Sequence, residues 1–434
     1  MDVRAYRTAW RGQTVTHAWW DTIQLEQEEM RPMASSRFTR SEWDAIRNCA
    51  ATSAEAFGLP LRRNRSVILG TFNIRELGRI RNRSRQAWEL LTMICHRFDL
   101  LALQEVADDL EGVKHIKQGL GDDFGMVVSD MTGVFPGDRG NPERLAFLFN
   151  WHRVQRTELA SDITYDRSQV IETLFNSRSQ FQKAWQTHAL NLEAWRERVL
   201  RAREAGGRTP SRPGIALPMF LTFIRQPHCA SFQIPGANGA RPVQFLAVNV
   251  HLLYGDSKLE RLWEFEALVD WLALRAKQRG RTYHENMLLM GDCNLEFENA
   301  GLKREEIDAR LKKLNSTKLK SARAAKVNFP LLTSHPAQGY LKTNARQDQT
   351  YDQIAIFAHD ARLPSYEANK SAGHFGDDEY DYGVFSFVDL FAEALHGVRF
   401  EVLGSEEQDY IYLKAKQEIS DHMPAWIRLP IPDS

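Results

Sequence analysis

The segment Leu288–Asn294, with the sequence LLMGDCN, is an apolar run that ends in an aspartate and an asparagine. A short apolar run of this kind is typical of a buried β-strand. Polar residues directly after a buried strand lie at the edge of its sheet. The segment therefore predicts a strand that brings oxygen ligands to one end of the fold.

The same arrangement recurs along the chain. Three further apolar runs end in a polar residue: Val67–Phe72 before Asn73, Asp99–Gln104 before Glu105, and Phe245–Val250 before His251. Ser420–His422 opens the last apolar stretch. Side chains at several such strand ends can converge on one sheet edge, and their oxygen atoms suit a hard cation such as Mg²⁺.

Bulk composition is that of an ordinary globular protein. The chain has 434 residues, 43% of them hydrophobic and 26% charged, so one large domain or two smaller ones are expected. Its formal net charge is zero, so any contact with nucleic acid must come from a local basic patch.

Cysteine usage and the terminal sequence point to a reducing compartment. The four cysteines are far apart and form no Cys-x-x-Cys pair, which excludes the usual structural zinc motif and a disulfide scaffold. The N-terminus lacks a signal-peptide pattern, and no apolar run approaches the roughly 18 residues of a membrane span. We therefore expect a cytoplasmic protein that does not bind membranes.

Segment patterns predict an α+β fold. Residues 1–64 are expected to form an N-terminal helical extension with a helix start at Ser41, and residues 65–434 one large domain. Helical spacing over Arg85–Ile94 and Leu259–Leu272 lies between strands, whereas Arg144–Phe149 is a strand without a neighbouring helix. This mixture predicts a four-layer α/β/β/α sandwich of two mixed sheets.

Two segments interrupt the pattern. Residues 166–205 are predicted to be a helical insertion, an arm or hairpin whose apolar stripe, including Trp185 and Val199, packs on the main body. Residues Leu363–Gly383, rich in glycine and acidic residues, are predicted to be a surface loop.

Six motifs in order resemble the endonuclease/exonuclease/phosphatase superfamily, and most closely its deoxyribonuclease-I-like branch. The motifs are Phe72-Asn73, Leu103–Val106, Asn249–His251, Gly291–Asn294, Tyr351–Ile354 and Ser420–His422. The resemblance covers residues 66–430 apart from the insertion, and it implies that residues 65–434 are a catalytic domain.

The resemblance also implies roles for single residues. Glu105 matches the principal metal-binding carboxylate, with Asn73 and Asp421 close to the metal, which is Mg²⁺ with Mn²⁺ or Ca²⁺ as alternatives. The catalytic residues implied are a pair that positions water and a phosphate oxygen, two histidines at the phosphate and a carboxylate that orients one of them: Asp292, Asn294, His251, His422 and Asp352.

Elementary chemistry supports these roles. A phosphodiester is an anion that resists an anionic nucleophile, so a cation held by Glu105 and Asp421 can neutralise charge on its oxygens. Asp292 can orient or deprotonate water. A carboxylate behind His422 favours the imidazolium, which binds the transition state more tightly than the ground state. Taken singly, each residue has an ordinary structural explanation, and their joint occurrence is what indicates catalysis.

A basic stretch lies beside the first motif. Five arginines precede or begin the first helix of the domain and could grip nucleic-acid phosphates: Arg75, Arg79, Arg81, Arg83 and Arg85. Arg75, Arg144 and Tyr254 are the predicted substrate-binding residues, the tyrosine by stacking on a base. A second basic run, from Lys312 to Lys326, is predicted to be an exposed helix face.

Three functions are compatible with these motifs. The first is a metal-dependent nuclease, with DNA favoured over RNA. The second is a phosphoesterase for a phospholipid headgroup, an inositol phosphate or another small phosphate; Glu296 stands where the inositol-phosphatase branch has arginine, which argues against it. The third is a binding module that has lost catalysis, although every expected catalytic residue type is present.

For a nuclease inside the cell we expect restraint of its activity by the helical additions, by a regulatory partner or self-association, or by a narrow substrate choice.

Overall fold

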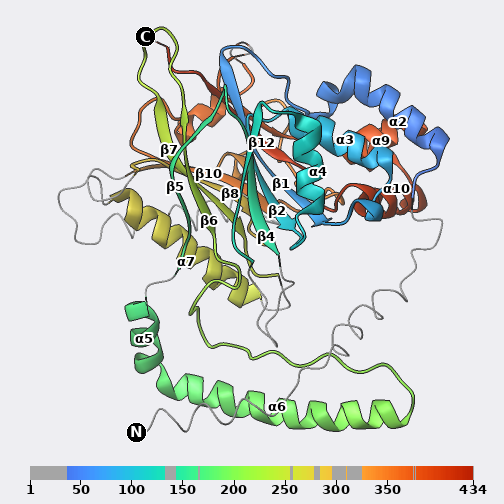
Figure 1. Cartoon of the computed structure of the whole chain (residues 1–434), viewed down its shortest axis with the longest axis vertical. Coiled ribbons are helices and arrows are strands. Elements are labelled where there is room, and N and C mark those ends of the chain that lie inside the picture. Colours follow the sequence, from blue (N-terminus) through green and yellow to red (C-terminus); the bar gives the residue numbers. More distant parts are fainter. Residues whose placement is uncertain are drawn as a thin grey trace.

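Two mixed six-stranded sheets face each other in a computed structural model that describes residues 37–131, 143–164, 167–254, 258–277, 284–295, 309, 325–374, 376 and 378–433 (Figure 1). The first sheet has the order β11 (Asp381–Val384), β12 (Ala425–Pro430), β1 (Ser66–Leu77), β2 (Leu100–Val106), β4 (Arg144–Asn150) and β3 (Phe124–Val128). The second has the order β5 (Gln155–Asp162), β6 (His228–Ile234), β7 (Val243–His251), β8 (Met287–Asp292), β10 (Asp352–Ala358) and β9 (Lys326–Asn328). Pairs β1–β2 and β7–β8 are parallel and the other pairs are antiparallel, so both sheets are mixed, as predicted.

Helices cover the outer faces of both sheets. One hydrophobic cluster joins the space between the sheets to the helices outside the first sheet, and another packs a single helix on the second. The helices at the first sheet are α2 (Arg40–Ser53), α3 (Arg85–His96), α4 (Glu111–Leu120), α9 (Phe387–His396) and α10 (Ser405–Glu418), and the one at the second is α7 (Lys258–Lys277). The predicted four-layer sandwich is therefore confirmed.

Aromatic side chains fill the space between the sheets. Phe232 of β6 meets Phe147 and Phe149 of β4 edge to face, with ring centroids 5.5 and 5.4 Å apart. Outside the second sheet, Phe265 of α7 packs against Phe329. Burial of such large rings supplies much of the hydrophobic stabilisation and fixes how one sheet lies on the other.

A polar bridge crosses this apolar core. Asn249 of β7 donates hydrogen bonds from Nδ2 to the carbonyls of Leu103 (3.0 Å) and Ala146 (2.9 Å) in the first sheet. Its Oδ1 accepts one from Gln104 Nε2 at 2.7 Å. These bonds satisfy buried polar groups on both sheets, so they favour one relative placement of the two.

The described part of the N-terminal extension is a helix docked on the domain. Thr39, not Ser41, caps α2, because Thr39 and Glu42 form a reciprocal capping box. Trp43 is buried against Phe38 and Phe391, so α2 shares the core of the first sheet. The predicted tryptophans Trp10, Trp19 and Trp20 lie outside the described residues, and the domain boundary at residue 64 stays a prediction.

The predicted insertion is helical but does not pack as expected. It forms α5 (Arg167–Asn176) and α6 (Arg178–Glu204), which lie apart from the two sheets in Figure 1. Trp185 is 68% exposed, and Val199 is the buried residue of α6. The apolar stripe instead meets the returning chain, where Trp195 Nε1 donates to the Pro210 carbonyl at 2.8 Å.

The prediction of a surface loop over Leu363–Gly383 is wrong. This segment contains a 3₁₀ turn, Tyr366–Ser371, and the first residues of β11. Asn369 is fully buried, donating to Asn328 Oδ1 (2.8 Å) and accepting from Tyr380 Oη (2.8 Å). This buried network anchors a segment whose composition alone suggested exposure.

Short 3₁₀ turns complete the described structure: Ala54–Phe57, Ile80–Asn82, Pro330–Leu332 and Phe400–Val402. Of the predicted basic run, all but Lys326, which begins β9, lies outside the described residues. Among the described helices, none has the length and apolar character that crossing a membrane requires.

Candidate active site

Strand register brings three predicted residues side by side. Asp292 ends β8, where it pairs with Asp352 of antiparallel β10 on one side and His251 of parallel β7 on the other. The first sheet delivers Asn73 from β1, and the loop after α10 delivers His422. The predicted convergence is therefore seen for Asn73, His251, Asp292 and His422, at neighbouring ends of two sheets, and Asp352 joins them from the start of its own strand.

Gly291 allows β7 and β8 to approach closely beside the site. Its φ is +147°, and a Cβ there would lie 2.1 Å from the Val250 carbonyl oxygen. Only glycine can occupy this position without moving a strand. Because Gly291 directly precedes Asp292, this close approach of the two strands also places the Asp292 carboxylate against its neighbouring side chains.

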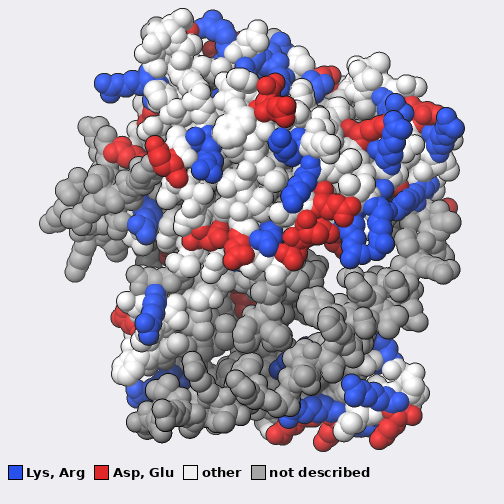
Figure 2. Space-filling model, in the orientation of Figure 1, with Lys and Arg blue, Asp and Glu red and all other residues white. Residues whose placement is uncertain are grey.

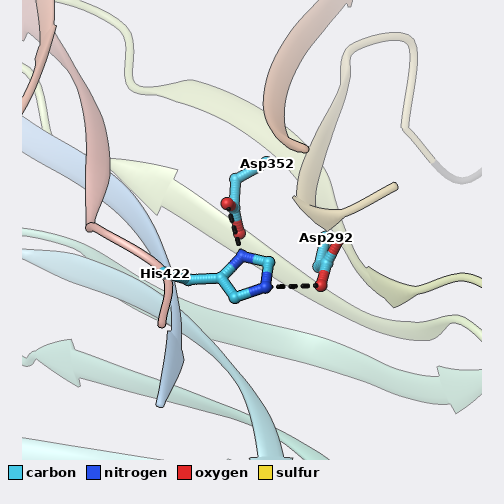
Figure 3. Close-up of side chains that lie close together, drawn as sticks. All are labelled: Asp292, Asp352 and His422. Carbon is cyan, nitrogen blue, oxygen red and sulfur yellow. Dashed lines mark hydrogen bonds and ion pairs between the residues drawn. The ribbon is translucent and has the colours of Figure 1, made fainter. Parts of the chain in front are cut away.

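One oxygen of Asp292 is shared by three side chains, of which Figure 3 draws His422. Asp292 Oδ2 accepts a hydrogen bond from Asn73 Nδ2 at 2.9 Å and lies 3.6 Å from His422 Nε2 and 3.7 Å from His251 Nε2. Burial alone would raise the pKa of Asp292, but the two imidazoles and the Asn73 amide lower it below its ordinary value. This carboxylate, which is 1% exposed, is therefore ionised at neutral pH.

Asn294 holds Asp292 from behind. Its backbone N–H donates to Asp292 Oδ1 at 2.8 Å, and its side-chain Nδ2 donates to the Leu252 carbonyl at 2.9 Å. Its φ is +49°, a left-handed conformation that asparagine tolerates. Asn294 thus fixes the orientation of Asp292 through its backbone, whereas the sequence suggested a side-chain contact with substrate.

His422 lies between two carboxylates. Its Nδ1 donates to Asp352 Oδ2 at 2.8 Å, and its Nε2 faces Asp292 (Figure 3). Burial opposes the charged ring, but Asp352 and Asp292 together raise the pKa of His422 well above its usual value. The imidazolium is the form that this site stabilises, and Thr343 Oγ1 fixes its partner by accepting from the Asp352 N–H.

His251 has a matching carboxylate that sequence reasoning missed. Its Nδ1 lies 2.5 Å from Glu143 Oε1, and Arg225 Nε lies 2.5 Å from the same oxygen. Burial and Arg225 would lower the pKa of His251, yet Glu143 raises it above the ordinary value. Glu143 directly precedes β4 and follows no apolar run, so the signal used for the other residues does not find it. Arg225 follows the apolar stretch 219–224, but that stretch forms no strand and was not singled out.

Glu105 and Asn73 offer oxygen ligands to a cation. Glu105 Oε1 accepts from Asn73 Nδ2 at 3.2 Å, and Oε2 accepts from the Glu76 N–H at 2.9 Å. Because Nδ2 faces two carboxylates, the Asn73 amide has its oxygen on the other side, where Oδ1 is buried without a hydrogen-bond partner among the described residues. The donor types of this pair, a carboxylate and an unpartnered amide oxygen, fit a hard cation such as Mg²⁺.

Asp421, which directly precedes His422, is held by a lysine. Lys416 Nζ is 2.9 Å from Asp421 Oδ2. Burial would raise the pKa of Asp421, and the neighbouring His422 and Lys416 lower it below the usual value. The position of Asp421 next to His422 suits a contact with a metal ion, and this contact stays a prediction.

A second grouping of possible ligands is better explained as a proton network. Single ligand atoms of Asp292, Asp352 and His422 lie within 4.8 Å of one another. His422 Nδ1 must carry a proton to donate to Asp352, and the raised pKa protonates Nε2 as well. A protonated nitrogen has no lone pair for a metal, so Glu105 and Asn73 stay the predicted metal ligands.

The predicted substrate-binding residues are not all at this site. Arg144 Nη2 is engaged by Asp108 at 2.8 Å, although its strand position pairs with Val106, next to Glu105. Tyr254 is 69% exposed and free to move toward a ligand. Arg75 is closest to the centre, since its backbone N–H donates to Ser420 Oγ at 3.1 Å.

The basic stretch proves to be partly structural. Arg83 is buried, donates to the carbonyls of Arg75, Glu76 and Ile419, and lies over the Trp88 ring. Arg85 forms an ion pair with Glu89 on α3. Arg83 and Arg85 therefore have structural partners, and phosphate binding by this stretch stays a prediction. Figure 2 shows Lys and Arg side chains interspersed with Asp and Glu side chains over the described residues of the face in view, in keeping with the zero net charge of the chain.

Comparisons with known proteins find similarity in structure alone. No protein-family profile and no curated protein matches the sequence. Solved structures that match include an endonuclease/exonuclease/phosphatase family protein from Bacteroides thetaiotaomicron, with 13% identity, covering 84% of this chain and 94% of that one, TM-score 0.41. Others are truncated Caenorhabditis elegans TDP2 (12% identity, 84% and 98% covered, TM-score 0.41) and the human Nocturnin catalytic domain with bound sulfate (13% identity, 84% and 93% covered, TM-score 0.39). At these TM-scores the likeness assigns no chemistry to this chain, whose function must follow from its own side chains.

Proposed function

We propose that this chain is a divalent-metal-dependent phosphodiesterase that hydrolyses a nucleic-acid backbone, with DNA as the favoured substrate. The observation that carries the proposal is the convergence on Asp292 Oδ2 of two imidazoles, each backed by its own carboxylate, and of the amide that also contacts Glu105. An ionised carboxylate between two imidazoliums, beside oxygen ligands for a cation, suits an anionic phosphoester attacked by water.

Each residue has a defined role in this mechanism. A cation held by Glu105 and Asn73 would neutralise charge on the phosphoryl oxygens. Asp292 orients the attacking water and accepts its proton as the new P–O bond forms. The imidazoliums of His251 and His422 bind the transition state, and one of them gives its proton to the leaving oxygen as the old P–O bond breaks. Asp352 and Glu143 keep both rings charged.

The experiment is a nicking assay on supercoiled plasmid with Mg²⁺. We expect relaxation of the plasmid by the wild type, and loss of it with a chelator or in Glu105→Ala and His422→Ala. Removing one such stabiliser typically costs about 10²- to 10³-fold in rate. Glu89→Ala, an exposed glutamate on α3, serves as the matched control that retains activity.

Two results would contradict the proposal. Nicking that persists in Glu105→Ala would show that the activity comes from elsewhere. Turnover of a small phosphomonoester, with no cleavage of DNA or RNA, would assign the same site to the alternative phosphoesterase function.

A further inference from the structure

A hollow lined by four arginines lies next to the candidate active site. Its volume is about 330 Å³, close to the lower end of the roughly 300–1,000 Å³ typical of ligand pockets. The N-terminal segment, the chain between β1 and α3, and the end of α10 form its walls. The lining residues are Arg37, Arg75, Glu76, Arg81, Asn82, Arg83 and Gln417.

The hollow carries an excess of positive charge. Arg75 Nη2 pairs with Glu76 at 2.8 Å, and Arg37 Nε lies 3.8 Å from the buried Glu418. Arg81 and Arg83 have no carboxylate within ion-pair distance among the described residues. Although Glu76, Glu418 and Glu105 act on Arg83 electrostatically, Arg81 is without a carboxylate partner among the described residues, so the charge balance of the hollow favours an anion.

Arg83 contributes charge to the wall of this hollow. The residue is 6% exposed, and its Nη atoms are bound to backbone carbonyls. Its Nε is buried and has no hydrogen-bond partner among the described residues. Arg83 therefore acts on a bound anion through its charge, and Arg81 is left to donate hydrogen bonds.

Backbone contacts place the hollow directly beside the reaction centre. The Glu76 N–H donates to Glu105 Oε2, and the Arg75 N–H donates to Ser420 Oγ, which in turn donates to the Asn73 carbonyl. Two residues of extended strand, the separation of Asn73 and Arg75, span about 7 Å. A strand phosphate one nucleotide away from the bond being cut could reach this position.

We infer that the arginine hollow is a subsite for a second phosphate of a polynucleotide strand, one step from the phosphodiester that is hydrolysed. The inference rests on the proposed function and adds a requirement for a flanking phosphate. It gives the N-terminal extension a part in substrate binding, because Arg37 belongs to the segment that the family resemblance does not cover. Guanidinium groups suit this role since they bind phosphate through paired N–H donors.

Paired substrates test the inference. One is a short single-stranded oligonucleotide; the other has the same sequence with the phosphate beside the cleaved bond replaced by a neutral methylphosphonate. We expect the wild type to cleave the all-phosphate strand about tenfold faster in kcat/KM, because one charge-assisted contact is lost in the other. Arg81→Ala should bring this ratio close to one, through KM more than kcat.

Arg81 suits mutation because its side chain has no partner among the described residues, so folding should be preserved. Arg156→Ala, an exposed arginine on β5 of the other sheet, is the matched control and should keep the ratio. A ratio near one in the wild type, or one that Arg81→Ala leaves unchanged, would overturn the subsite while the Glu105-dependent hydrolysis still supported the proposed function.

A binding measurement distinguishes failure of the subsite proposal from failure of the proposed hydrolase function. If neither strand is cut, fluorescence anisotropy of the labelled oligonucleotide, with a chelator present, measures its binding to the protein and hence to the arginine hollow. The slope of log K against log salt should fall by about 0.7 in Arg81→Ala for one lost phosphate contact on a single strand. An unchanged slope would overturn the subsite, and a reduced slope would support it even though the hydrolase proposal had failed.

Discussion

Asp352 controls the charge of His422 through a single hydrogen bond. It is one of two carboxylates that raise the pKa of this histidine well above its usual value. A raised pKa means that the imidazolium persists through neutral pH and is lost only as the pH rises through that higher value. In Asp352→Asn the charged ring should be lost at a lower pH, and activity at neutral pH should fall by about 10²- to 10³-fold.

The pH dependence of kcat and an NMR titration of His422 would check this prediction. The alkaline limb of the profile should move to lower pH in the variant. Asp381→Asn is the matched control, because Asp381 lies 3.0 Å from His335 in an Asp–His pair away from the site. An alkaline limb that stays in place in Asp352→Asn would mean that His422 does not act as a cation.

Gly291 is the backbone position on which the placement of Asp292 depends. Gly291→Ala would put a Cβ 2.1 Å from the Val250 oxygen at a φ of +147°. We expect a loss of more than about 3 kcal/mol in the free energy of unfolding, measured by urea denaturation. Gly397→Ala has a φ of +70° and open space around the new Cβ, so it should cost only the left-handed strain of about 1–2 kcal/mol. Equal losses in both variants would refute the steric explanation.

Sequence patterns and the family resemblance located most residues of the candidate site but missed two of them. Asn73, Asp292 and His251 follow apolar runs, whereas Asp352 and His422 were indicated by the resemblance. Glu143 and Arg225 were missed, because their position depends on how two sheets and a returning segment pack. The conformation of Asn294 was also beyond the pattern, which gives the residue type but not which of its atoms faces the site.

At the scale of elements, α2 is attached to α10 by a buried ionic contact. Lys414 Nζ lies 3.3 Å from Glu42 Oε2, and Tyr410 Oη also donates to this carboxylate. Partial burial would raise the pKa of Glu42, but the hydrogen bonds from Tyr410 and Thr39 and the charge of Lys414 lower it to about 2. A lowered pKa stabilises the fold above the unfolded pKa of about 4.5, and this contribution is lost as the pH falls toward 2.

Glu42→Gln should therefore destabilise the protein most at neutral pH. Urea denaturation of the variant and the wild type at several pH values would measure the difference in unfolding free energy. We expect this difference to shrink as the pH is lowered from 5 toward 3. A difference that stays constant across this range would show that the Glu42 carboxylate is not paired in the folded state.

The positions of helices in the sequence were predicted more reliably than the surfaces against which those helices pack. Helical spacing identified α3 and α7, since their apolar faces cover sheets. The stripe of α6 has similar spacing, yet Trp185 is exposed, because spacing does not say which surface a helix meets. The segment ending at Gly383 was misjudged for the opposite reason: its acidic composition hid the buried Asn369.

For the whole molecule, the site depends on how two sheets are placed relative to each other. Asn249 bridges them with three hydrogen bonds in the core. Asn249→Ala would remove the donor to two buried carbonyls and one of the two acceptors of Gln104 Nε2, at about 1–3 kcal/mol for each unsatisfied group. We expect a loss of at least about 3 kcal/mol by urea denaturation, together with reduced activity.

Gln244→Ala on the same strand provides the comparison. Gln244 is exposed and bonds to Gln233 within one sheet, so its loss should change stability by no more than about 0.5 kcal/mol. If Asn249→Ala is equally mild, the sheets are held by apolar packing alone.

Strand β12, which follows all other described strands in the sequence, lies inside the first sheet. It pairs with β1 on one side and β11 on the other, and it begins three residues after His422. During synthesis on the ribosome, β1 must therefore wait until residues 425–430 have been made before it gains this neighbour. The histidine of the candidate site is made just before the same segment. A nascent chain therefore lacks the complete candidate site until this segment has been synthesised.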